Sequence, residues 1–156
     1  MTRLDRMRKD YERFTKAEGY IIGFPVGDMV YGAKLDKIPR RYTKVQKECS
    51  KMGGTYGLYI NVKSKKAQAE LMKNAFPVCT LAELEDGTYN KGVMFEKSVY
   101  EYFGQTFRGK DNVPFNVAGD ININGVEIQV KFQGARLTKA NTLERLKKEM
   151  NKRVDN

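Results

Sequence analysis

Three side chains in the second half of the chain converge if Asn124-Gly125 closes a β-hairpin. Asn-Gly between two alternating stretches is a strong hairpin signal, because a type I′ turn needs positive φ at both central residues. A two-residue turn sets Asp120 directly opposite Gln129, with their Cβ atoms about 4.5–5.5 Å apart. Lys131 follows Gln129 by two residues, so its side chain points to the same face. The spacing therefore predicts a carboxylate, an amide oxygen and an ammonium on one patch of a sheet.

These three groups suit the metal-assisted hydrolysis of a phosphodiester. Mg²⁺ or Mn²⁺ takes oxygen ligands, which Asp120 and either the side-chain oxygen of Gln129 or a neighbouring carbonyl can supply. A bound ion lowers the pKa of a water and screens a phosphate, and Lys131 can orient that water or stabilise the growing charge. The competing interpretation is a solvated outer face of a hairpin, which has the same alternation of apolar and polar residues.

Glu127 shares the predicted polar face but lies one step nearer the turn. It can be a secondary acid or have no role in the site. If it were the acid partner instead, the motif would run from Glu127 through Gln129 to Lys131, and the metal would shift by one residue pair.

The composition leaves few other routes to catalysis. The 156 residues include no histidine, which excludes Ser-His-Asp and Cys-His catalysis, His-containing zinc sites and nucleases with a histidine base. The two cysteines, Cys49 and Cys79, are too few for a four-thiolate site, and we expect both to be reduced and buried. Any chemistry must come from carboxylates, amides, Lys, Arg, Tyr or the backbone.

The net charge of +10 favours a polyanionic partner, most simply nucleic acid. Residues 1–80 hold 17 Lys+Arg against 8 Asp+Glu, so nearly all of the excess lies in the first half. Basic residues beside an expected helix start can bind backbone phosphates, although a basic loop or a solvated helix face has the same composition. The candidates are Arg40, Arg41 and Lys44 in the first half and Lys139 in the second.

The residues of the hairpin resemble a nuclease motif. Asp120 followed by Gln129-Val130-Lys131 is similar to the motif of the PD-(D/E)XK superfamily, in the variant with Gln in place of the middle acid that is familiar from Mrr-type restriction enzymes. Residues 92–96 (GVMFE) resemble the helix that opens the nuclease core in Mrr-type and Holliday-junction-resolving relatives. The resemblance covers residues 91–152 and implies a helix, a three-stranded meander and a closing helix.

The resemblance also implies that Glu96 helps Asp120 and Gln129 to hold the metal. The alternatives are an ordinary surface acid at Glu96, or Glu101 in the same role. Gly119 stands where the motif often has Pro, a common change in this superfamily. The family core usually continues into another strand, so we expect a strand from the first half, a second subunit or a trimmed core.

Hydrophobic periodicity and turn residues predict the elements that position these side chains. Thr43 with Gln46 and Thr80 with Glu83 are capping-box patterns that predict helices, the first of them reaching Met52. The other predicted helices are 2–17, 65–74, 91–103 and 139–152, the last with Thr138 as a cap, and the predicted strands are two within 20–35, then 55–62, 115–123 and 126–133.

The sequence thus predicts an α+β fold with a mixed sheet: a restriction-endonuclease-like core at 89–156 and a basic N-terminal α/β extension at 1–88, or one compact domain. The expected function is that of a Mg²⁺-dependent DNA endonuclease acting on duplex or branched DNA as a homodimer or tetramer. A non-catalytic nucleic-acid-binding protein, or an RNA-binding module, is the alternative. With no secretory signal and no long apolar run, we expect a cytoplasmic protein of phage or mobile-element origin with no membrane association.

Overall fold

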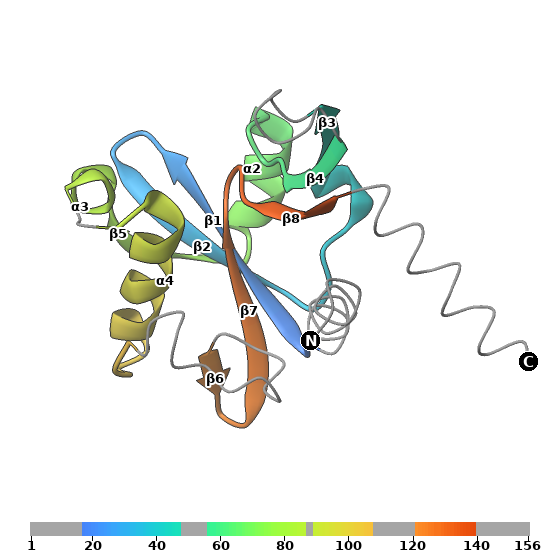
Figure 1. Ribbon diagram of the computed structural model, residues 1–156. Coiled ribbons are helices and arrows are strands. Elements are labelled where there is room, and N and C mark those ends of the chain that lie inside the picture. The colour runs from blue at the N-terminus through green and yellow to red at the C-terminus, as the bar shows by residue number, and fades with distance from the viewer. Residues whose placement is uncertain (1–16, 48–55, 87–88, 108–120, 140–156) are drawn as a thin grey trace, which may run out of the picture.

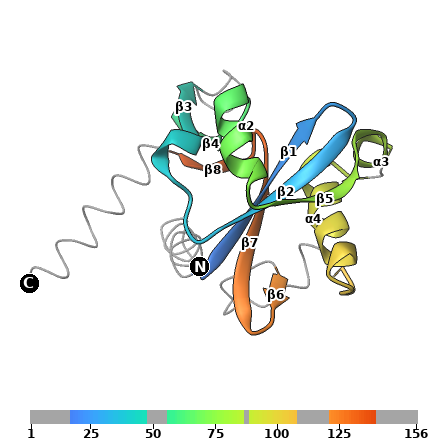
Figure 2. The ribbon, with the colours of Figure 1, turned by 180° about the vertical axis from the view of Figure 1, so that it is seen from behind.

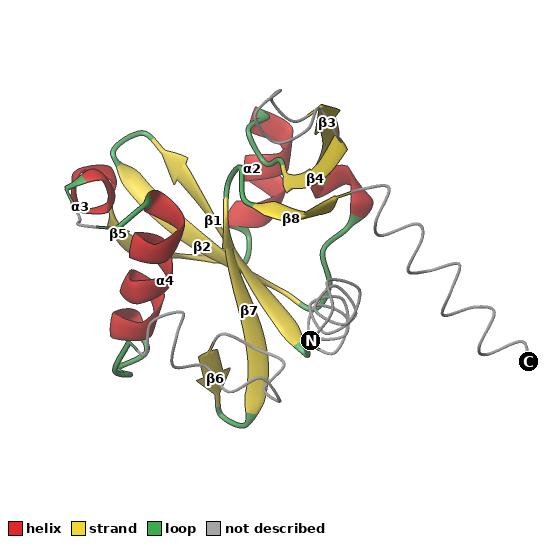
Figure 3. Cartoon of the chain, viewed as in Figure 1, coloured by secondary structure: helices red, strands yellow, loops and turns green. Residues whose placement is uncertain are grey.

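The computed structural model describes residues 17–47, 56–86, 89–107 and 121–139. They form two sheets and a few helices, which confirms the predicted α+β class (Figures 1 and 3). The larger sheet has the strand order β5-β2-β1-β7-β6 and the smaller one the order β3-β4-β8. In chain order the elements are β1 (Gly19–Val26), β2 (Met29–Leu35), the 3-10 helix η1 (Arg40–Tyr42), β3 (Thr43–Lys47), β4 (Tyr56–Ile60), α2 (Lys65–Met72), β5 (Ala75–Thr80), α3 (Leu81–Glu85), α4 (Lys91–Tyr102), β6 (Ile121–Ile123), β7 (Val126–Phe132) and β8 (Arg136–Lys139).

The centre of the larger sheet is strand β1, which pairs antiparallel with β2 and parallel with β7. Its Ile21 and Ile22 are both fully buried although they point to opposite faces. A strand buried on both faces needs a continuous apolar run, which residues 19–26 (GYIIGFPV) provide. The first predicted pair of strands is thereby confirmed, with its turn at Gly27 in the left-handed region (φ 61°).

Two apolar clusters occupy the two faces of this sheet. Ile21 belongs to the first cluster, together with Phe95 and Val99 of α4 and the side chains of Ile128 and Val130. The second cluster, on the side of Tyr20 and Ile22, includes Ala67 and Leu71 of α2 and Ile60 of the smaller sheet. Figures 1 and 2 show α4 and α2 on different sides of the molecule accordingly.

The predicted helices at 65–74, after Thr80 and at 91–103 are confirmed, the first of them ending two residues earlier. Thr80 and Glu83 form the full capping box at the start of α3. Asn90 caps α4 by accepting a hydrogen bond from the backbone N–H of Val93. Gly104 follows α4 with φ 68°, as a C-terminal glycine does.

The predicted helix from Thr43 to Met52 is wrong for residues 43–47, which form strand β3. The Thr43 hydroxyl donates to the carbonyl of Arg40 at 2.8 Å and closes the 3-10 turn, so it does not cap a helix. Residues 43–47 pair residue by residue with β4, and this ladder replaces the local helical hydrogen bonds. Residues 48–52 lie outside the described residues.

The predicted start of the closing helix is also wrong. Thr138 and Lys139 form the end of β8, where they pair with Leu58 and Gly57 of β4. The remainder of that prediction, like residues 2–16 of the helix predicted at 2–17 and residues 115–120 of the first hairpin strand, lies outside the described residues. Strand β5, which the sequence pattern did not predict, joins the larger sheet by pairing with β2.

Each sheet combines strands from both predicted regions of the chain, residues 1–88 and residues 89–156. β1 from the first half pairs with β7, and β4 pairs with β8. Of the three expected ways to complete the sheet, the structure shows the first, a strand from the first half of the chain.

Cys79 is a free, buried thiol, and burial raises its pKa. Cys49 lies outside the described residues.

We predict that Gly23→Ala lowers the free energy of unfolding by about 1–3 kcal/mol, since overpacking costs that much in a tight core. A Cβ atom at Gly23 would lie 2.4 Å from Cζ of the Phe95 ring. Urea denaturation measures the loss, and Phe95→Leu in the same chain should recover part of it. Gly19→Ala is the control, because its Cβ would meet Leu35 and Ile128 at ordinary contact distances of 3.5 and 3.6 Å. Equal losses at Gly19 and Gly23 would contradict this account of the packing.

Candidate functional site

The hairpin that carries the predicted site has the expected turn and register. Asn124 and Gly125 have φ values of 53° and 85°, as a type I′ turn requires. Ile123 pairs with Val126, Asn122 with Glu127, and Ile121 with Ile128. The register prediction is thus confirmed for these three pairs. Asp120, the next residue along the strand, lies outside the described residues.

Gln129 and Lys131 share one face of β7, but that face is not the solvated surface of an isolated hairpin. The parallel neighbour β1 sets Tyr20 beside Gln129 and Ile22 beside Lys131. Gln129 is only 5 % exposed, and burial raises the pKa of the Tyr20 hydroxyl. Lys131 is half-buried. The competing interpretation of an ordinary solvated hairpin face therefore does not describe Gln129.

Glu96 lies on α4, which packs against the opposite face of β7. The Phe95 ring stands 5.4 Å from the ring of Phe132, on the face that also carries Ile128 and Val130. Glu96 is 9 % exposed, and it and Gln129 are the two buried residues, of those described, that are neither apolar nor tyrosine. Helix α4, which carries Glu96, thus lies on one side of β7, whereas Gln129 and Lys131 point to the other side.

Glu127 takes part in the hydrogen bonds that shape the hairpin. Its carboxylate accepts from the Asn122 side chain at 2.9 Å, and its backbone makes two hydrogen bonds with Glu18. Asn122 in turn accepts from the backbone N–H of Gly125 at 2.9 Å. Through these contacts Glu127 stabilises the hairpin beside its turn.

A metal centre made of described residues alone is not present. In the parts of the chain that the structure describes, no three Cys, Asp or Glu side chains gather where they could hold a metal ion. Gln129 brings an oxygen donor of the kind that Mg²⁺ accepts, whereas Glu96 approaches from the other face. The donor set predicted from the sequence is complete only with Asp120.

Arg41 and Tyr42, in the predicted phosphate-binding segment, are tied to α2 through Glu70. Tyr42 donates its hydroxyl to Glu70 at 2.5 Å, and Nε of Arg41 lies 3.1 Å from the same carboxylate oxygen. The Arg41 guanidinium also lies over the Tyr42 ring, 4.8 Å from its centroid. The hydrogen bonds from Tyr42 and Arg41 lower the pKa of Glu70, and Glu70 raises the pKa of Arg41. Arg40 is exposed beside them.

Two predicted phosphate-binding residues, Lys44 and Lys139, both belong to the smaller sheet. They lie on β3 and β8, which flank β4 on its two sides. Lys44 pairs with Tyr59, and Tyr59 pairs with Arg136 on the other side. Sequence reasoning missed Tyr59 and Arg136. The available signal was the alternation of β-branched Thr43 and Val45, which marks residues 43–47 as a strand.

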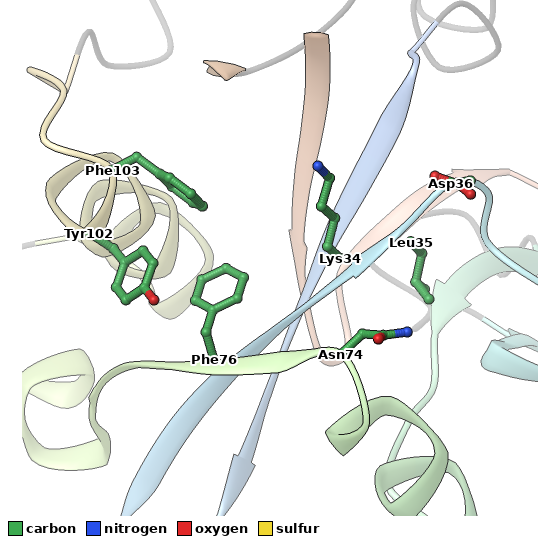
Figure 4. Close-up of a pocket in the computed structure, with 7 residues that line it drawn as sticks. All are labelled: Lys34, Leu35, Asp36, Asn74, Phe76, Tyr102 and Phe103. Atoms are coloured by element: carbon green, nitrogen blue, oxygen red, sulfur yellow. The ribbon is translucent and has the colours of Figure 1, made fainter. Parts of the chain in front are cut away.

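A pocket of about 610 Å³ opens at the C-terminal end of α4. Figure 4 shows the rings of Phe76, Tyr102 and Phe103 on one side of it and Lys34, Asp36 and Asn74 toward the other. Phe76 and Tyr102 are stacked, with centroids 4.6 Å apart. Of the predicted site residues that the structure describes, Glu96, Gln129 and Lys131 do not line this pocket.

Comparison of the chain with protein-family models, with curated proteins and with solved structures gives no match. The function must therefore be argued from the residues and their arrangement. None of the helices in the described ranges is long and apolar enough to span a membrane.

We predict that Glu70→Gln lowers the melting temperature at neutral pH and that this difference shrinks in acid. A carboxyl whose pKa is lower in the folded than in the unfolded state stabilises the fold above its unfolded pKa. That stability is lost as the pH falls through the folded value. Thermal melts between about pH 7 and pH 3 cover the range around the ordinary Glu pKa. Glu101→Gln, at an exposed position of α4, is the control. A difference that stays constant with pH would contradict the ionic role of Glu70.

Proposed function

We propose that this protein is a metal-dependent DNA endonuclease of the PD-(D/E)XK type, with a restriction-endonuclease-like core. The observation that carries the proposal is the hairpin register, in which Ile121 pairs with Ile128 across a type I′ turn. If the same ladder continued by one residue, it would set Asp120 opposite Gln129, with Lys131 on the face of Gln129. The near-complete burial of Gln129 supports the proposal in another way, because electrostatic interactions with a bound ion are stronger where water is excluded.

The roles follow from the chemistry of the side chains. Asp120 and Gln129 are the oxygen donors that would hold Mg²⁺ or Mn²⁺, and the bound ion supplies an acidified water and screens the phosphate. Lys131 supplies a positive charge that stabilises the negative charge developing on the phosphate oxygens during in-line displacement. The basic first half of the chain supplies long-range attraction for DNA.

Glu96 is considered apart from the other candidate ligands, because α4 packs against the face of β7 opposite to Gln129. As a third ligand it would have to act from beyond the strand that carries Gln129. Its burial at 9 % exposure is the observation that keeps it among the candidates.

We predict that Lys131→Ala reduces Mg²⁺-dependent DNA cleavage by about 10²–10³-fold, the usual loss when a transition-state charge partner is removed. The assay follows supercoiled plasmid, linear duplex and four-way junctions with Mg²⁺ or Mn²⁺. Lys91→Ala, at an exposed position at the start of α4, should cleave as the wild type does. If the wild type and Lys131→Ala are equally inert on every substrate, the endonuclease proposal fails.

We further predict that Asp120→Asn removes the Mn²⁺-dependent rise in melting temperature, because a ligand that binds only the folded state stabilises it. Glu96→Gln tests the second acid in the same thermal-shift experiment. Loss of the shift in Glu96→Gln assigns Glu96 to the ion, and an unchanged shift assigns the ion to Asp120 and Gln129 alone. An unchanged shift in Asp120→Asn overturns the metal site.

A nucleic-acid-binding protein without catalysis is the second candidate function. It is favoured by the smaller sheet, where Lys44, Tyr59 and Arg136 lie on adjacent strands. This candidate predicts DNA affinity that falls steeply with salt and no cleavage with any metal. A homodimer or tetramer that cuts both strands, a cytoplasmic location and a phage or mobile-element origin remain predictions that accompany the endonuclease proposal.

A further inference from the structure

We propose that the outer face of the smaller sheet binds single-stranded nucleic acid. The outer face is defined by Lys44 on β3, Tyr59 on β4 and Arg136 on β8. The inference rests on the proposed function in one respect only, namely that the partner of this basic chain is a nucleic acid. It adds the surface, the residues and the form of nucleic acid that the surface fits.

The core contacts establish which face is the outer one. Ile60 of β4 belongs to the apolar cluster that includes Ala67 and Leu71 of α2, so its side of the strand faces that helix. Tyr59, the preceding residue, points to the other side. Figures 1 and 2 agree, because α2 lies behind β4 in the first view and in front of it in the second.

β8 follows the same division. Leu137 packs against the α2 side of the core, and its neighbour Arg136 is exposed. Arg136 pairs with Tyr59, and a register shift at this point leaves Leu137 as the extra residue of β8. Arg136 and Tyr59 therefore share the outer face.

The three side chains form a row across the sheet with the aromatic ring in the middle. Tyr59 pairs with Lys44 on one side and with Arg136 on the other. Direct partners in antiparallel strands have Cβ atoms about 4.5–5.5 Å apart, so each cation lies next to the ring position. Lys44 and Arg136 are exposed and Tyr59 is half-buried. A base can stack on the ring while the phosphates on its two sides meet the cations.

The charge of the smaller sheet is complementary to a polyanion. Its three strands contain four basic residues, namely Lys44, Lys47, Arg136 and Lys139, and no acidic residue. The strands of the larger sheet contain Lys34, Lys131 and Glu127 as their charged residues. The basic residues of the two sheets are thus concentrated on the smaller one.

The central tyrosine favours a single strand over a duplex. Bases in a duplex are stacked on each other and offer no face to a side chain on a sheet, whereas unpaired bases stack on aromatic rings with little sequence preference. The row therefore fits unpaired nucleotides, such as those at branches, flaps and ends.

The test is the binding of a fluorescently labelled oligo-dT and of a matched duplex, measured by anisotropy with the full chain in EDTA. We expect tighter binding of the single strand and about a tenfold loss in Tyr59→Ala, within the range that removal of one stacking interaction produces. Tyr59→Phe should bind as the wild type does, and Tyr59→Leu, which keeps bulk without an aromatic face, should bind as weakly as Tyr59→Ala.

Matched controls separate stacking from general charge and from folding. Tyr89→Ala removes a tyrosine that is 57 % exposed elsewhere, and Lys91→Ala removes an exposed lysine, and both should bind oligo-dT as the wild type does. In Lys44→Ala/Arg136→Ala, the slope of log affinity against log salt should become shallower by about 0.7 for each phosphate that the protein no longer neutralises. Circular dichroism melts check that the Tyr59 variants remain folded, and only folded variants are compared.

The outcomes distinguish this inference from the endonuclease proposal. Wild-type affinity in a folded Tyr59→Leu variant, or equal affinity of the wild type for duplex and single strand, overturns the single-strand surface. Cleavage that depends on Lys131 together with unchanged binding in Tyr59→Leu would leave the endonuclease and remove this surface. Binding that depends on Tyr59, without cleavage of any substrate, would leave the single-strand surface and remove the endonuclease proposal.

Discussion

The parallel pairing of β1 with β7 is the interaction on which the rest of the structure depends. These strands come from residues 19–26 and 126–132, so a segment near the beginning of the chain completes the sheet that holds the hairpin. The sheet that this pairing completes separates two apolar clusters, one under α4 and one shared with α2 and the smaller sheet, and these clusters bury β1 on both faces. Without β1, β7 would lose the strand that pairs with it over residues 128–132.

This pairing also decides the environment of the candidate catalytic residues. Gln129 lies beside Tyr20, and Lys131 beside Ile22, so the polar face of the hairpin adjoins a core and not bulk solvent. Electrostatic interactions are stronger where water is excluded, which suits groups that must hold an ion or stabilise a developing charge. The same burial makes each polar group costly, which limits how many of them one face can carry.

The second sheet is a consequence of the same arrangement. After β7, the chain turns at Gly134, and β8 continues into the smaller sheet beside β4. At this junction the backbone N–H of Ile60 donates to the carbonyl of Ala135, and the backbone N–H of Gly134 donates to the carbonyl of Ile60. The two sheets are therefore joined at the point where β7 leads into β8. A single stretch of chain therefore connects the proposed catalytic strand to the proposed nucleic-acid surface.

Local sequence determined those elements whose signals act over a few residues. The Asn124-Gly125 turn, the Thr80–Glu83 capping box, α4 with Gly104 after it, and the first hairpin were all predicted, because their stabilising contacts lie within the segment itself. Only the tertiary structure decided that residues 43–47 are a strand, that Thr138 and Lys139 belong to a sheet, that α4 faces away from Gln129, and that Lys44, Tyr59 and Arg136 form one row. Each of these depends on hydrogen bonds or packing between segments far apart in the chain, which outweigh local preferences. Even at residues 43–47, where β-branched Thr43 and Val45 alternate, the competing capping-box pattern left the local sequence undecided.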